Sequence, residues 1–150
     1  MAQAIALKFD PRDEVPTMAH LGFLQAQISR MGTHAFALKP VSITLTLGTL
    51  GFYGVTPTPS PGWALVAMIA ITALWTLNAG YYRLERRFRN LYDAVIAGEA
   101  EPLSMNIAHF SKSDGGFYGA MTNWSVMPIH ALCNAGLAGM SVATYLTSHI

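Results

Sequence analysis

The stretch that decides the fold is WALVAMIAITALWTLNAGYYRLERRFRNLY, residues 63–92. Its first part, residues 63–82, carries no charged side chain and is long enough to cross the hydrocarbon core of a bilayer as a helix. Trp63 at one end and the tyrosine pair at the other are aromatic residues of the kind that mark membrane interfaces. The stretch therefore predicts a transmembrane helix.

The same helix is predicted to continue beyond the apolar segment. Residues repeat at spacings of three and four along two seams, which keeps each seam on one face of a continuous helix. The first seam is Trp75, Asn78, Tyr82, Glu85, Arg89 and Tyr92, and the second is Tyr81, Leu84, Phe88, Leu91 and Val95. Gly98 favours an end of the helix at Ala97, and Pro102 prevents an early restart. Residues 83–123 are accordingly expected to be a cytosolic helix extension followed by a loop.

Charged side chains are unevenly distributed along the 150 residues. They make up 11% of the chain and are absent from residues 40–82 and 115–150. A soluble domain has about 25% charged residues and needs polar groups along its whole surface, so this distribution predicts a single integral membrane domain over 1–150. The net charge of +1 argues against a nucleic-acid partner. The single cysteine, Cys133, excludes an intrachain disulfide.

The sequence predicts an all-α membrane protein with three spans, at about 39–55, 63–82 and 126–146. The first two form a helical hairpin over 39–82, because the connection TPTPSPG cannot continue a helix. The third span, within 124–150, has Asn123 or Ser125 as its cap and Pro128 in its first turn. Its polar and small residues leave an alternative open, in which this segment lies in the membrane interface.

Lysines and arginines near the span ends all lie on one side, which the positive-inside rule assigns to the cytosol. This places the N-terminus and residues 83–123 inside and the hairpin turn outside. Residues 18–38 are predicted to form an amphipathic helix, which either packs on its own chain or lies on the membrane surface. Its apolar stripe consists of Leu21, Leu24, Ile28 and Met31.

No motif of a nucleotide-binding, hydrolytic or metalloprotease site occurs in the sequence. The five histidines form no pair at ligand spacing, and all eight carboxylates lie outside the predicted spans. We therefore expect neither an enzyme nor a bound metal or cofactor. His130, the one histidine inside a predicted span, is expected to hydrogen-bond a neighbouring helix.

Four polar residues form the candidate pore or polar face. Ser42, Thr46 and Thr49 share one face of the first span, and Asn78 lies near the inner end of the second. A hydroxyl stripe can line water in an oligomeric pore, bond back to its own helix or bond across a dry interface. Asn78 is a candidate for an interhelical hydrogen bond.

Small residues on the first and third spans predict close helix packing. Gly48 and Gly51 give the first span a smooth side, and Ala135 and Gly139 belong to a small-residue stripe on the third. Such stripes let helices approach each other closely. We expect them to support a homo-oligomer in the lipid bilayer.

Residues 75–92, WTLNAGYYRLERRFRNLY, resemble the core motif W-x-L-D-x-x-Y-x-x-x-E-R-x-F-R-x-L-Y of a group of small bacterial multi-span membrane proteins. The stretches LQAQISRM at 24–31 and LSMN at 103–106 look like the leader helix and the post-helix loop of the same group. The group is similar to the SLATT class of membrane effectors. Asn78 stands where the motif has aspartate.

The resemblance implies an oligomeric effector in the bacterial inner membrane, acting in antiphage or conflict defence. It would form a pore or perturb the bilayer when a cytosolic sensor or partner protein triggers it. The face formed by Tyr82, Glu85, Arg89 and Tyr92 would couple cytosolic assembly to the spans. The alternative is a non-conducting scaffold or accessory subunit whose helix extension docks a cytosolic partner.

Overall fold

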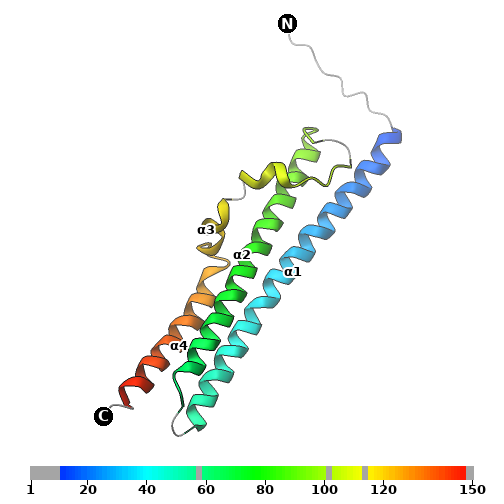
Figure 1. Ribbon diagram of the computed structural model, residues 1–150. Coiled ribbons are helices and arrows are strands. Elements are labelled where there is room, and N and C mark those ends of the chain that lie inside the picture. The colour runs from blue at the N-terminus through cyan, green and yellow to red at the C-terminus, as the bar shows by residue number, and fades with distance from the viewer. Residues whose placement is uncertain (1–10, 57–58, 101–102, 113–114, 148–150) are drawn as a thin grey trace.

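The computed structural model describes residues 11–56, 59–100, 103–112 and 115–147, and its regular elements over these ranges are all helices (Figure 1). The elements are α1 (Pro11–Val55), α2 (Gly62–Ile96), the 3-10 turn η1 (Ala108–Lys112), α3 (Gly116–Met121) and α4 (Met127–Thr147). α1 and α2 form a long antiparallel hairpin, and α4 packs against both near the hairpin turn. The predicted all-α class is confirmed.

α1 and α2 are both long and apolar enough to cross a membrane. Only 11% of the apolar window of α1 and 28% of that of α2 is buried inside the chain, whereas a core helix of a soluble protein is mostly covered. Large apolar side chains such as Leu47 and Val66 point away from the bundle. Among the described helices, α4 does not meet the same criterion of length and apolar composition, although its Leu132 side chain also points away from the bundle.

α1 is one continuous helix, where the sequence suggested an amphipathic helix over 18–38 and a separate span from residue 39. Pro40 lies in its interior and not in a first turn. A proline removes only one helical hydrogen bond, here the bond from residue 40 to the carbonyl of Phe36. α2 packs on α1 on both sides of this position, beside Gly32 and at Tyr53, and this packing outweighs the lost bond.

The bundle has two halves along its length. Among the described residues, the apolar half comprises 40–56, 59–82 and 127–147, and the charged half comprises 17–39, 83–100 and 103–112. In the apolar half, three helices bury a core of Ala67, Ile71, Cys133 and Leu137.

The charged half consists of α1 and α2 with the loop after α2. Leu24 and Met31 of α1 and Leu91 of α2 are buried there. The apolar stripe predicted for residues 18–38 thus packs on its own chain. The ring of His20 also contacts the carbonyl oxygen of Ser104 at 3.1 Å, which ties the loop to α1.

α2 confirms the predicted continuous helix across the charge boundary, since it runs unbroken from Gly62 to Ile96. Gly98 follows with a φ of 71°, the left-handed conformation that favours glycine at the end of a helix. At the other end of α2, the Tyr53 hydroxyl donates to the Ser60 carbonyl at 2.7 Å and accepts the Ala64 N–H at 3.1 Å. This tyrosine therefore holds the hairpin turn closed.

Candidate functional site: a buried polar cluster between three helices

Ser42 of α1, Asn78 of α2 and His130 of α4 meet in one polar cluster inside the bundle. The Nδ1 atom of His130 lies 3.1 Å from the Ser42 hydroxyl, and its Nε2 atom lies 3.0 Å from the side-chain nitrogen of Asn78. All three residues are buried, with exposures of 1% or less. The expectations that His130 bonds a neighbouring helix and that Asn78 bonds across helices are both confirmed.

With the amide nitrogen of Asn78 facing the ring, the donors and acceptors of this cluster indicate one histidine tautomer. The Asn78 amide nitrogen can only donate, so Nε2 of His130 accepts and Nδ1 carries the proton. Nδ1–H then donates to the Ser42 oxygen, and the Ser42 hydroxyl donates to the Leu38 carbonyl at 3.1 Å. In this arrangement His130 cannot take a proton from Ser42, so the pair is not a serine nucleophile with its base.

Asn78 leaves one polar atom of the cluster unpaired. Its side-chain oxygen is buried and has no hydrogen-bond partner among the described residues. An unpaired buried acceptor costs roughly 1–3 kcal/mol. A polar group held at such a cost inside an apolar bundle is a candidate for a functional role.

Trp75 connects the cluster to α3. Its indole stacks on the His130 ring with centroids 6.2 Å apart, and its Nε1–H donates to the Met121 carbonyl at 3.0 Å. The side chain of Asn123 accepts the Ser125 N–H at 2.9 Å, so Asn123 organises the turn that starts α4. The cluster therefore fixes where α4 enters the bundle.

The cluster lies close to the charged half. Ser42 is three residues from Lys39, and Asn78 is five residues from Arg83. At 1.5 Å per residue, these separations are roughly 5 and 8 Å along the helices. The remainder of α4 runs from His130 toward the hairpin turn (Figure 1).

The predicted hydroxyl face is divided between the inside and the outside of the bundle. Ser42 and Thr46 are buried, while Thr49 is half-buried. Thr46 donates to the Ser42 carbonyl and Thr49 to the Leu45 carbonyl, each at 2.8 Å, so both hydroxyls bond back to their own helix. The structure brings Ser42 and Asn78 together through His130, and it does not bring Thr49 into that cluster.

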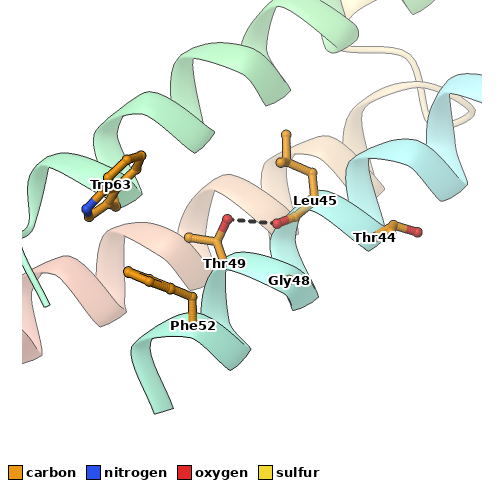
Figure 2. A pocket seen from close by; sticks show the side chains of 6 residues that line it. All are labelled: Thr44, Leu45, Gly48, Thr49, Phe52 and Trp63. Atoms are coloured by element: carbon orange, nitrogen blue, oxygen red, sulfur yellow. Dashed lines mark hydrogen bonds between the residues drawn. The ribbon is translucent and has the colours of Figure 1, made fainter. Parts of the chain in front are cut away.

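Thr49 lines an open, mostly apolar groove of about 450 Å³ between α1 and α2 near the hairpin turn (Figure 2). Trp63 and Phe52 form its outer end, where their rings meet edge to face at 6.0 Å. The residues that line the groove are Thr44, Leu45, Gly48, Thr49, Phe52 and Trp63.

The four small residues predicted to pack helices all lie on the outside of the chain. Gly48, Gly51, Ala135 and Gly139 are exposed. A Cβ atom built on any of the three glycines would meet nothing within 4 Å. The helix contacts inside one chain do not use these stripes.

The predicted coupling face is turned largely toward α1 of the same chain. Glu85 lies beside Gly32 and forms an ion pair with Arg89 at 2.6 Å. Arg89 and Tyr92 line a cleft with residues of α1, whereas Tyr82 packs near Ala79 on the side of α3.

Comparison of the chain with protein-family models, with curated proteins and with solved structures gave no match. Sequence reasoning identified His130 and Asn78 separately but did not connect them to Ser42. The signal was present in part, because Ser42 and Asn78 lie near the charged ends of one uncharged segment and His130 lies near the start of the third predicted span. Assigning the three residues to the same depth along the bundle would have predicted that they meet.

Proposed function

We propose that this chain is an integral protein of the bacterial inner membrane with three spans, α4 being the third, and with a cytosolic N-terminus. It acts as an oligomeric effector that forms a pore or perturbs the bilayer when a cytosolic partner triggers it. It carries out no catalysis. The single chain described above corresponds to the resting state, in which Ser42 and Thr46 face the bundle interior.

One observation carries this proposal: Ser42 and Thr46 are buried in the bundle, whereas the small residues Gly48, Gly51, Ala135 and Gly139 are exposed. His130 holds Ser42 inward, while Gly48 and Gly139 are exposed with open space beside them. Exposed small residues allow copies of the chain to pack closely in a bilayer. Release of Ser42 from His130 within such an assembly would supply polar groups to line a water path.

The test is membrane potential, read with a voltage-sensitive dye after induction of the chain in a bacterium. The variant Ser42→Ala/Thr46→Val removes both hydroxyls with little change in volume. The matched control is Thr72→Val/Thr76→Val, because these two hydroxyls also bond back to their own helix but face outward on α2.

We expect high-level induction to replace the partner, so that the native chain and the α2 control depolarise the cell and the α1 variant does so much less at equal membrane abundance. Equal depolarisation by all three chains would show that the hydroxyl face is not part of the pathway. A steady potential in all three would exclude an autonomous pore.

The second candidate function is a non-conducting scaffold that docks a cytosolic partner. The observation that favours it is the length of the charged half, which exposes apolar side chains such as Phe23 and Ile96. A scaffold keeps the membrane potential steady and loses its partner when Phe23→Ser and Ile96→Ser are introduced. The effector keeps depolarising the cell with Thr72→Val/Thr76→Val and loses that activity with the α1 variant.

A further inference from the structure

α3 lies beside the uncharged part of α2, although residues 99–123 were expected to be a cytosolic loop. The Trp75 indole donates to the Met121 carbonyl, and Ala79 shares a small buried cluster with Ala120 and Val126. Trp75 is eight residues from Arg83, the first charged residue after the apolar stretch, which is roughly 12 Å along the helix. Figure 1 shows α3 against the side of α2 that faces away from α1.

The outer surface of α3 and the following turn is aromatic. Tyr118 and Trp124 are 81% and 86% exposed, and Phe117 is 43% exposed, while Ala120 and Val126 are covered. No charged residue occurs from Gly115 to the end of the sequence. Exposed apolar surface of this kind marks a contact with a partner or with a membrane.

This aromatic surface lies between a basic group and an apolar face. On the charged side, a Cβ atom built on Gly115 would lie 3.2 Å from Nη1 of Arg86, so this guanidinium is next to the start of α3. On the other side, the chain continues into α4, whose Leu132 is 75% exposed. Tyrosine and tryptophan favour the boundary between lipid headgroups and acyl chains, because one end of each ring system is apolar and the other is polar.

We propose that residues 116–126 are a lipid-contact surface that lies in the headgroup–acyl boundary of the cytosolic leaflet. Phe117, Tyr118 and Trp124 are its anchors, and Arg86 is positioned beside them for a lipid phosphate. Phospholipid is the occupant because the segment lies beside the uncharged part of α2, leads directly into the apolar α4 and offers no charge of its own to a soluble partner. The inference rests on the membrane location proposed above.

The experiment measures the depth of a nitroxide spin label in vesicles of phosphatidylethanolamine and phosphatidylglycerol. Tyr118→Cys and Trp124→Cys are labelled separately in a Cys133→Ala background, since the native thiol is the one cysteine of the chain. Collision with oxygen reports lipid, and collision with a water-soluble nickel complex reports solvent. Leu65→Cys, on the exposed apolar face of α2, is the lipid control, and Met18→Cys, exposed on the charged half, is the solvent control.

We expect labels at 118 and 124 to collide more with oxygen than with nickel, at a ratio between those of the two controls. A ratio equal to that of the Met18 control, with the Leu65 control in lipid, would overturn the lipid surface and leave the spans intact. Immobile labels that neither reagent reaches would show that a second copy or another protein covers the surface, which also overturns the proposal. A solvent-like ratio at Leu65 as well would overturn the membrane location itself.

Discussion

His130 is the residue on which the three helices of the apolar half converge. It contacts α1 through Ser42, α2 through Asn78 and Trp75, and it belongs to α4. The bond with Asn78 satisfies a buried amide N–H, and the bond with Ser42 satisfies a buried ring nitrogen, so the imidazole determines how the helices are positioned and does not merely fill space.

Replacement of His130 by alanine is expected to destabilise the bundle by about 3 kcal/mol, because it leaves a cavity beside Trp75 and removes the partners of Ser42 and Asn78. Thermal unfolding in detergent micelles measures this loss. His109→Ala is the control, since that side chain is exposed on η1. Equal melting temperatures for the two variants would contradict a structural role of the cluster.

The hydrogen-bond pattern also predicts which nitrogen of His130 carries the proton. We expect Nδ1 to be protonated and Nε2 to be an acceptor, because the Asn78 amide nitrogen faces Nε2. Nitrogen chemical shifts of histidine-labelled protein distinguish the two tautomers, and His130→Ala assigns the signal. The opposite tautomer would require the Asn78 oxygen to face the ring and would make Nδ1 a possible base for Ser42.

At the scale of the elements, Pro40 and Pro128 occupy contrasting places. Pro40 lies in the interior of α1, where its ring interrupts the backbone bonding, whereas Pro128 lies in the first turn of α4, where an N–H would have no helical partner. The same residue type therefore has different energetic consequences in the two helices.

Pro40→Ala is expected to stabilise the chain, by up to about 3 kcal/mol, since it restores a donor for the Phe36 carbonyl and relieves the steric clash of the ring. Pro128→Ala is the matched control and is expected to leave the melting temperature almost unchanged. An unchanged or lower melting temperature for Pro40→Ala would indicate that a bend at this position is needed for packing against α2.

The elements differ in how far the sequence could predict them. α2 was predictable across the charge boundary because its two seams depend only on local spacing, and Gly98 marks its end. The continuity of α1 could not be predicted, because a proline commonly lies in the first turn of a helix. Only the packing of α2 on both sides of Pro40 shows that α1 continues through it. The sequence did not predict α3, because a glycine-rich segment is typical of a loop. Gly115 and Gly116 both take positive φ, just before α3 and at its start.

The polar cluster was predictable only in part for a similar reason. His130 is 52 residues from Asn78 and 88 from Ser42 along the chain, so no motif spacing links them. Residue type alone indicated that each polar group needs a partner in an apolar segment. Which partner it finds depends on the depth at which three separate helices cross.

At the scale of the whole molecule, the two halves of the bundle imply a topology. Lys39 and Arg83 end the charged half on two neighbouring antiparallel helices, and the described part of the hairpin turn carries no charge. Under the positive-inside rule, such an asymmetry supports the proposed topology, in which the charged half is cytosolic. α4 then leads away from the cytosol, and the helix beyond His130 is roughly 26 Å long, close to the thickness of a bilayer core.

Labelling of intact cells with a membrane-impermeant maleimide tests this topology. In a Cys133→Ala background, Ser60→Cys in the hairpin turn and Thr147→Cys at the end of α4 are expected to react from outside, whereas Met105→Cys in the loop after α2 reacts only after the cells are opened. All three positions are exposed in the chain, so burial cannot explain a failure to react with the maleimide. Reaction of Ser60→Cys without Thr147→Cys would mean that α4 lies in the membrane without crossing it. Reaction of Met105→Cys in intact cells would reverse the orientation, because the basic residues flanking the spans would then lie outside.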